Sequence, residues 1–405
     1  MKKRVLSLSL ALAMAASLTA CGSSSSTTET TAAAAADATT AAAGASSESS
    51  SDKVFKIGGI GPKTGSAAVY GLATEYGAQV AVKEINALGG LQFELDFQDD
   101  EGDAEKAVNA YNNLKGKGMQ VLYGTTTTTP CVAVSAETFG DRIFQLTPSA
   151  SSTKVTEGKD NVFQACFTDP NQGKAAANYI KEHNLGTKVA AIYNNGDAYS
   201  TGIFNAFKAQ AAEIGLEIVA ESTFPDDTNA DFTVQLGEAQ KAGADLVFMP
   251  IYYTPASLIL NQAKTMGYAP SFFGCDGVDG ILDLEGFDAS LAEGLMLMTP
   301  FNAWGEDDRT VNFVKEYQEL TGGVPNQFAA DGYDCVYAIY EACQQAGVTA
   351  DMGPQEVCEK LTKVFTDGSF AVDGLTGSGM HWQTNGEVSK DPVVVKVESG
   401  KYVTQ

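Results

Sequence analysis

Short apolar runs alternate with longer helix-forming segments along most of this chain, and no other feature constrains its fold as much. Strands connected through helices in this way form parallel sheets with helices on both faces. The fold class is therefore α/β, with doubly wound parallel sheets. In the first half, strands are predicted at 54–60, 91–97, 119–124, 143–147 and 162–167.

The same alternation starts again beyond residue 170 and predicts a second sheet. At 405 residues the chain is also too long for one ordinary core. Three late helices suggest that the chain returns to complete the first lobe, and two similar lobes favour a ligand between them. The second set of strands is predicted at 188–193, 216–220, 245–251, 271–274 and 295–299, and the late helices at 310–320, 327–346 and 355–364.

The N-terminus has the pattern of an export signal. A basic start, Lys2-Lys-Arg4, precedes an apolar segment at 5–18 that is short for a membrane span. Leu18-Thr-Ala-Cys21 follows, which is typical of a bacterial lipoprotein signal at 1–20 with Cys21 as the lipidated residue. An ordinary secretory signal cleaved nearby is the alternative. Residues 22–52 are mainly Ser, Thr and Ala, which predicts a flexible tether.

Charge and cysteine content exclude several classes of function. The formal net charge of −24 argues against a nucleic-acid partner, which requires a basic surface. No Cys-x-x-Cys pair occurs and the chain has only two histidines, so no metal site is predicted. Disulfides and buried free thiols both remain open for the cysteines beyond Cys21, which are Cys131, Cys166, Cys275, Cys335, Cys343 and Cys358.

A run of five threonines, at 125–129, follows the predicted strand at 119–124. Thr129 is the predicted N-cap of the next helix and Pro130 its first residue. A second hydroxyl-rich loop, at 148–152, follows the next strand. Ligands of parallel sheets bind at the carboxyl ends of strands, and helix N-termini attract anions. The two loops therefore predict a site for a carboxylate or phosphate.

Two other stretches resemble a dinucleotide-binding loop and a calcium-binding loop, but each lacks a residue that the motif requires. The loop after the first strand has Gly59 and Gly61 but Thr64 where a dinucleotide motif requires a third glycine. The acidic cluster at 99–103 places Ala104 where a calcium loop requires glycine. We expect Asp103 to cap the helix that follows it.

A series of ordered motifs extends across 53–405. They are Ile57-Gly-Gly-Ile-Gly-Pro62, Ala81-Val-Lys-Glu-Ile-Asn-Ala-Leu-Gly-Gly90, Leu146-Thr-Pro-Ser-Ala150, Cys166-Phe-Thr-Asp-Pro-Asn-Gln-Gly-Lys174, Tyr252-Tyr253 and Gly274-Cys-Asp-Gly277. This series resembles the branched-chain amino-acid binding proteins of ABC importers, which have the type I periplasmic binding fold. Because the motifs are spread over nearly the whole folded chain, the resemblance is specific.

The resemblance implies two lobes that are joined by three crossovers and close around the ligand. The crossovers are expected near 168–172, 299–302 and 380–383. The first lobe would comprise 53–170 and 302–381, and the second 171–301 and 382–405.

The resemblance also implies the binding residues. Thr128, Ser149 and Ser151 would hold a ligand carboxylate, and Asp276 a ligand ammonium. Asp276 stands where this family usually carries Glu, which places the ammonium nearer the second lobe or behind a bridging water. The remaining implied contacts are aromatic: Tyr199 and Tyr252 from the second lobe, and Tyr70 beside the ligand side chain.

These features predict an extracytoplasmic, lipid-anchored, monomeric receptor that delivers a small aliphatic amino acid to ABC permease subunits, without a cofactor. No hydrolase motif is found, so an enzyme is not expected. Two alternatives remain open. The same fold would accept a neutral amide or an aromatic acid, and an exported amidase or peptidase would represent another class.

Overall fold

The computed structural model describes residues 53–225 and 229–405. The predicted signal peptide at 1–20, the lipidation site Cys21 and the tether at 22–52 lie outside these ranges. None of the helices within them is long and apolar enough to cross a membrane.

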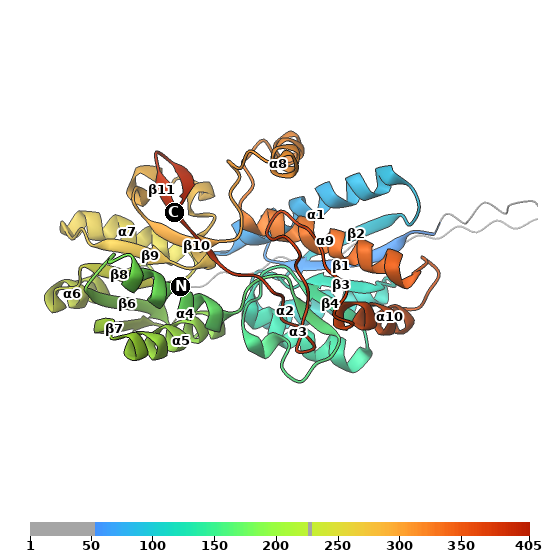
Figure 1. Ribbon diagram of the computed structural model, residues 1–405, viewed down its shortest axis with the longest axis horizontal. Helices are drawn as coiled ribbons and strands as arrows, with labels where there is room; N and C mark the ends of the chain where they lie inside the picture. Colours follow the sequence, from blue (N-terminus) through green and yellow to red (C-terminus); the bar gives the residue numbers. More distant parts are fainter. Residues whose placement is uncertain (1–52, 226–228) are drawn as a thin grey trace, which may run out of the picture. The chain divides into compact units, whose positions relative to one another are not determined.

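The first sheet has five parallel strands in the order β2-β1-β3-β4-β5 (Figure 1). The loops that follow β3 and β4 therefore leave the same edge of the sheet, as predicted for the two hydroxyl-rich loops. The strands are β1 (Phe55–Gly61), β2 (Phe93–Asp99), β3 (Val121–Gly124), β4 (Phe144–Thr147) and β5 (Val162–Gln164).

The second sheet has seven strands in the order β12-β11-β10-β9-β8-β6-β7. Five are parallel, whereas β11 and β12 form an antiparallel hairpin at one edge. The predicted α/β class with two doubly wound sheets is thus confirmed. The strands are β6 (Lys188–Asn194), β7 (Glu217–Phe224), β8 (Leu246–Met249), β9 (Ser271–Gly274), β10 (Met296–Thr299), β11 (Val393–Glu398) and β12 (Lys401–Thr404).

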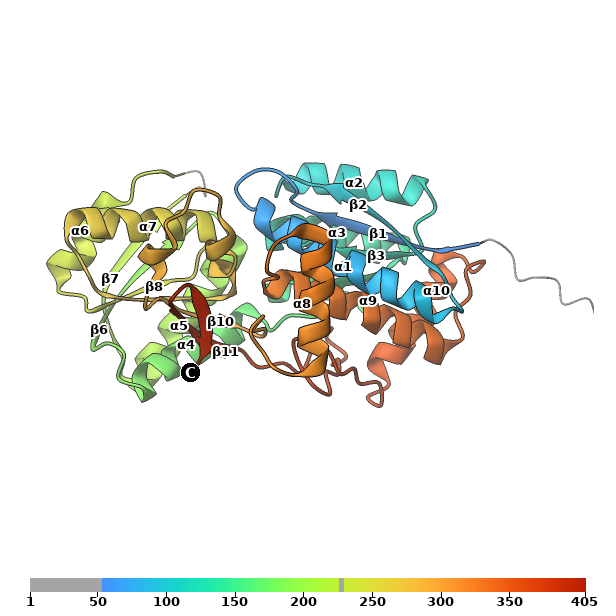
Figure 2. The ribbon, with the colours of Figure 1, turned by 90° about the horizontal axis from the view of Figure 1, so that it is seen from above.

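Helices cover both sheets, and segments distant in sequence lie side by side, such as α1 and α9 (Figure 2). The helices beside the first sheet are α1 (Ala68–Leu88), α2 (Ala104–Gly116), α3 (Thr128–Asp141), α9 (Gln327–Ala346) and α10 (Pro354–Thr366), with α8 (Asp308–Thr321) against α1. Those beside the second sheet are α4 (Asp169–Glu182), α5 (Ala198–Ile214), α6 (Thr233–Ala242) and α7 (Tyr253–Met266).

Glycine allows α1 and α9 to approach closely. A Cβ atom on Gly77 of α1 would lie 1.9 Å from the carbonyl oxygen of Ala329 on α9. A Cβ atom on Gly332 of α9 would lie 2.6 Å from the carbonyl oxygen of Thr74 on α1. Both distances are far below van der Waals contact, so the two helices pack backbone to backbone.

Two details of the first lobe bear on the predictions. The strand predicted at 162–167 ends at Gln164, because its partner β4 ends at Thr147, which pairs with Gln164. Asp103 caps α2 as expected, since its carboxylate accepts a 2.9 Å hydrogen bond from the N–H of Lys106. All six cysteines in the described ranges are buried free thiols.

Candidate ligand-binding site

Helix α3 begins two residues before its predicted start. Thr127 is the N-cap, with an extended backbone (φ −102°, ψ 154°) and no capping bond from its side chain. The prediction that Thr129 caps the helix and Pro130 opens it is therefore wrong. Pro130 occupies the third helical position, where the missing N–H again has no intrahelical partner. The Thr129 hydroxyl instead donates to Asp197 Oδ1, at 3.2 Å.

The two hydroxyl-rich loops are hydrogen-bonded to each other. Ser149 Oγ donates to the carbonyl oxygen of Thr126 at 2.6 Å, and Thr147 Oγ1 donates to that of Thr125 at 2.7 Å. Thr127 Oγ1 is buried and has no hydrogen-bond partner in the structure. The first turn of α3 adds backbone N–H groups that no helical carbonyl can reach. This side of the site is rich in donors and carries the positive end of a helix dipole.

The opposite side of the site is built around Asp276, which opens the short 3₁₀ turn Asp276–Val278 directly after β9. Tyr199 donates its hydroxyl to Asp276 Oδ1 at 2.7 Å and accepts the N–H of Gly277 at 2.9 Å. The N–H of Asp276 donates to Gln172 Oε1 at 3.1 Å. Two hydrogen bonds through one phenol thus fix both the carboxylate and its turn.

Asp276 is only 4% exposed, and burial raises the pKa of its carboxyl group to about 6. None of the ion pairs in ranges 53–225 and 229–405 includes Asp276. A buried carboxylate without a cation is costly, because it loses hydration without electrostatic compensation. A cation that entered the site would relieve this cost.

Aromatic rings complete the site. The ring of Tyr199 stacks on that of Tyr252 with centroids 5.1 Å apart. Tyr70 lies 5.4 Å from Tyr252 and 4.2 Å from Phe328, and its hydroxyl donates to the carbonyl oxygen of Gly277. Tyr70 belongs to α1 and Gly277 follows β9, so this hydrogen bond joins elements of the two sheets. The rings form an apolar end next to the two polar sides.

These groups surround one cavity of about 10 Å³, which is room for a single water molecule, so the two sides must move apart before an amino acid can enter. Six of the seven binding residues that the sequence predicts line this cavity, and Ser151 does not. Ser151 is fully buried behind the loop, where its carbonyl oxygen accepts the N–H of Asp169 at 2.9 Å. The lining residues are Tyr70, Thr126, Thr127, Thr128, Ser149, Tyr199, Tyr252, Asp276, Gly277 and Phe328.

Phe328 is the lining residue that the sequence prediction missed most clearly. It lies in the first turn of α9, where Asn326 caps the helix by accepting the N–H groups of Phe328 and Ala329. An aromatic residue just behind a strong N-cap is the only local signal. That signal does not reveal that this turn meets Tyr70, which is more than 200 residues earlier in the chain.

Metal binding finds no support at this site. Among the described residues, no cluster of three or more His, Cys, Asp or Glu side chains is arranged to hold a metal ion. The cavity instead offers hydrogen-bond donors at one side, a carboxylate at the other and rings between them. This arrangement suits a small molecule with a negative and a positive group.

The chain resembles proteins of one family over nearly its whole folded length. The model of a family described as periplasmic binding protein matches residues 54–401. A curated relative, Leu/Ile/Val-binding protein homolog 3 of Brucella melitensis, is 32% identical, and the match covers 86% of this chain and 92% of the relative.

Solved structures agree. LivJ of Streptococcus pneumoniae, a branched-chain amino-acid transporter substrate-binding protein in complex with isoleucine, is 28% identical with a TM-score of 0.78, over 87% of this chain and 100% of that one. The leucine-binding protein LivK of Thermotoga maritima is 25% identical with a TM-score of 0.77, over 87% and 98% of the two chains. The chain therefore belongs to the periplasmic binding protein family and has its type I fold.

Proposed function

We propose that this protein is the extracytoplasmic receptor of an ABC importer, which captures a branched-chain or other small aliphatic amino acid and delivers it to permease subunits in the membrane. One observation carries the proposal: the carboxylate of Asp276, which is buried and has no cationic side chain beside it, shares a small cavity with the N-terminus of α3. An amino acid has the two charges that this cavity would compensate. The Leu/Ile/Val-binding relative and the isoleucine complex of LivJ support this ligand class.

Each end of the ligand has a proposed partner. The carboxylate binds the hydroxyls of Thr127 and Thr128 and the N–H groups of the first turn of α3. Ser149 lines the same end and orders the loop through its bond to Thr126.

The ammonium binds Asp276, while the face of a tyrosine ring adds cation–π attraction. The aliphatic side chain packs among the rings of Tyr70, Tyr252 and Phe328. Ser151 has no direct contact in this arrangement, because it does not line the cavity.

The wider assignment follows from the same proposal. The protein acts as a monomeric receptor and catalyses no reaction, and lipidation of Cys21 holds it at the outer face of the cell membrane. Mass spectrometry of the membrane fraction tests the anchor: a diacylglyceryl group on Cys21 is expected, and a soluble chain cleaved elsewhere contradicts it.

Isothermal titration calorimetry with matched ligands tests the binding site. Isoleucine is expected to bind with one site per chain. 3-Methylpentanoate lacks the ammonium and isoleucinamide lacks the carboxylate, so each is expected to bind at least 100-fold more weakly. Benzoate is included as a test of the alternative in which the same fold binds an aromatic acid. If either single-charge ligand binds as tightly as isoleucine, the proposal is wrong, and product formation in the same samples, followed by NMR, would identify an enzyme instead.

A further inference from the structure

One face of α9 connects the ligand cavity with the segments that join the two sheets. Gln327, Asp331 and Asp334 are spaced by four and three residues, which places them on the same side of the helix. At the cavity end, Gln327 Nε2 donates to the carbonyl oxygen of Asp276 at 2.8 Å, and its backbone N–H donates to Asp279 Oδ2 at 3.0 Å. The first turn of α9 is therefore bonded to the loop that carries the proposed ammonium site.

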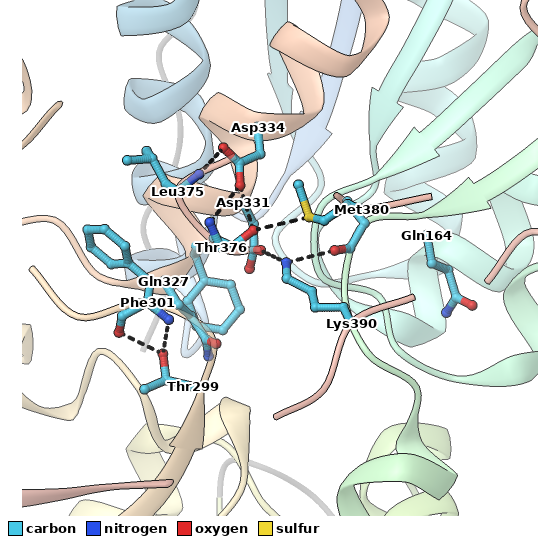
Figure 3. Close-up of polar contacts among 12 residues, drawn as sticks. Gln164, Thr299, Phe301, Gln327, Asp331, Asp334, Leu375, Thr376, Met380 and Lys390 are labelled. Carbon is cyan, nitrogen blue, oxygen red and sulfur yellow. Dashed lines mark hydrogen bonds and ion pairs between the residues drawn. The ribbon is translucent and has the colours of Figure 1, made fainter. Parts of the chain in front are cut away.

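One turn further along α9, Asp331 forms a buried ion pair with Lys390 (Figure 3). Lys390 Nζ lies 2.9 Å from Asp331 Oδ1, and the two side chains are 2% and 3% exposed. The same ammonium donates to the carbonyl oxygen of Ala165 at 2.8 Å. The other ion pairs of the described residues all include a side chain that is more than 25% exposed.

Lys390 occupies a connecting segment. It lies three residues before β11 of the second sheet, whereas Ala165 directly follows β5 of the first sheet. Its ammonium thus joins α9 to two segments through which the chain passes between the sheets.

Asp334 supplies a second anchor on the same face of α9. Its carboxylate accepts hydrogen bonds from the N–H groups of Leu375 and Thr376, at 2.8 and 2.9 Å, and from Thr376 Oγ1 at 2.5 Å (Figure 3). The hydrogen bonds of this anchor run to the loop at 375–376, and the Lys390 ammonium adds an electrostatic interaction with the Asp334 carboxylate. On this face of α9, the pair of Lys390 and Asp331 therefore connects the helix to the segments that join the two sheets.

We propose that Lys390 and Asp331 form a clamp that positions the first turn of α9 against the Asp276 loop and so sets the affinity for the ligand. Neither residue lines the cavity, so both are positioning residues. The apparent affinity scales with the fraction of molecules in which the binding groups are correctly placed. Without the clamp, α9 and the segment before β11 lose their shared anchor, and this fraction falls. The inference rests on the proposed amino-acid ligand.

The test uses the full mature chain, isoleucine as the probe and stopped-flow binding kinetics. Removing Lys390 alone would leave a buried carboxylate without its cation and put folding at risk. The main variant is therefore the double substitution Asp331→Asn with Lys390→Met, which removes both charges at nearly constant volume. We expect the dissociation constant to rise at least tenfold, mainly through slower apparent association, because fewer free molecules are correctly arranged.

Two further variants separate positioning from general destabilisation. Lys390→Arg keeps the charge but places a larger, planar guanidinium in a buried site, so we expect a loss of affinity that is smaller than that of the double variant. Lys396→Met breaks the half-exposed pair between Lys396 and Glu398 on β11 and is expected to leave the dissociation constant within twofold. Thermal unfolding of each variant in the absence of ligand gives the stability for comparison.

The outcomes are distinct. A tenfold loss in the folded double variant, with a smaller loss in Lys390→Arg, supports the clamp. Wild-type affinity in the folded double variant overturns it and leaves the proposed function intact. If the double variant does not fold, Asp331→Asn alone replaces it: a dissociation constant at least threefold higher than that of wild type supports the clamp, and wild-type affinity overturns it. If the wild-type chain binds no amino acid, the proposed function fails and this inference with it.

Discussion

The two sides of the cavity differ in how they carry polarity. The side from the first sheet contributes hydroxyls and backbone N–H groups, without a charged side chain among its lining residues. The side from the second sheet contributes the carboxylate of Asp276, held by Tyr199. Dipoles on one side and a full charge on the other give a ligand a single favourable orientation. They also place most of the cost of burying charge at this site on one residue, Asp276.

The two sides are also supported differently. The hydroxyl loops bond to each other through Ser149 and Thr147, and single further bonds join Thr126 to Thr74 of α1 and Thr129 to Asp197. The Asp276 turn is bonded instead to helices of both sheets, through Gln172 of α4 and Gln327 of α9. We therefore expect changes on the carboxylate side to have the larger effects, and four measurements test this difference.

The substitution Asp276→Asn should have the largest effect. It keeps the shape of the side chain but removes the only charge of the cavity, so an ammonium group would lose its counter-ion in a buried site. We expect isoleucine affinity to fall at least 100-fold, or about 3 kcal/mol, by calorimetry. Asp308→Asn, at an exposed position of α8, is the matched control. If the Asp276→Asn variant binds isoleucine as tightly as wild type, Asp276 does not bind the ammonium group.

Acidification should weaken binding for the same reason, because protonation also removes the negative charge of Asp276. Burial raises the pKa of Asp276 to about 6 in the unliganded protein, and an ammonium group prefers the ionised carboxylate. Binding must therefore expel a proton below pH 6, and affinity should fall about tenfold between pH 7.5 and pH 5. Above pH 6.5 it should be constant.

Neighbouring carboxyl groups require a control. Burial also raises the pKa of Asp331, although the neighbouring Lys390 ammonium opposes this shift, and burial raises the pKa of Asp169; both groups interact with Asp276. The Asp276→Asn variant separates their contribution. If its weaker binding keeps the same pH dependence, another group is responsible.

On the hydroxyl side, Thr128→Val should have a moderate effect. It replaces a buried hydroxyl that lines the cavity by a methyl group of similar size. A carboxylate would lose one donor, which should cost about 1–2 kcal/mol of binding free energy in calorimetry. Thr265→Val, at an exposed position of α7, should change nothing. Equal affinities of the two variants would exclude Thr128 from the site.

Ser149→Ala should have the smallest effect. Its hydroxyl already donates to the carbonyl oxygen of Thr126, so we expect it to order the loop more than to bind the ligand. Losing one such bond should cost about 0.5–1 kcal/mol, visible as a two- to fivefold higher dissociation constant. A loss as large as that of Asp276→Asn would contradict the division of roles between the two sides.

Local patterns were sufficient to predict the parallel strands of both sheets, but not the antiparallel hairpin of β11 and β12. Apolar runs such as the one that became β8 predict strands because they must be buried on both faces. Local patterns were insufficient to predict the first residue of α3, because five adjacent threonines have identical capping chemistry. The backbone that leaves β3 decides that Thr127 is the cap.

Contacts between distant segments were beyond local patterns. Gln327 meets the Asp276 turn 51 residues away in sequence, and Lys390 meets Asp331 across 59. A lysine near the valine-rich end of the chain normally faces solvent. Its burial depends on a carboxylate that only the assembled fold brings to it. The same holds for Ser151, which belongs to the correct loop but lies behind the cavity.

The unpaired carboxylate of Asp276 has a consequence for the life of the protein outside the cytoplasm. A ligand at 100 times its dissociation constant stabilises the folded chain by about 2.7 kcal/mol. Proteases that cleave transiently unfolded chains would then remove the empty receptor faster than the loaded one. The abundance of the receptor would follow the supply of its ligand, without any change in transcription.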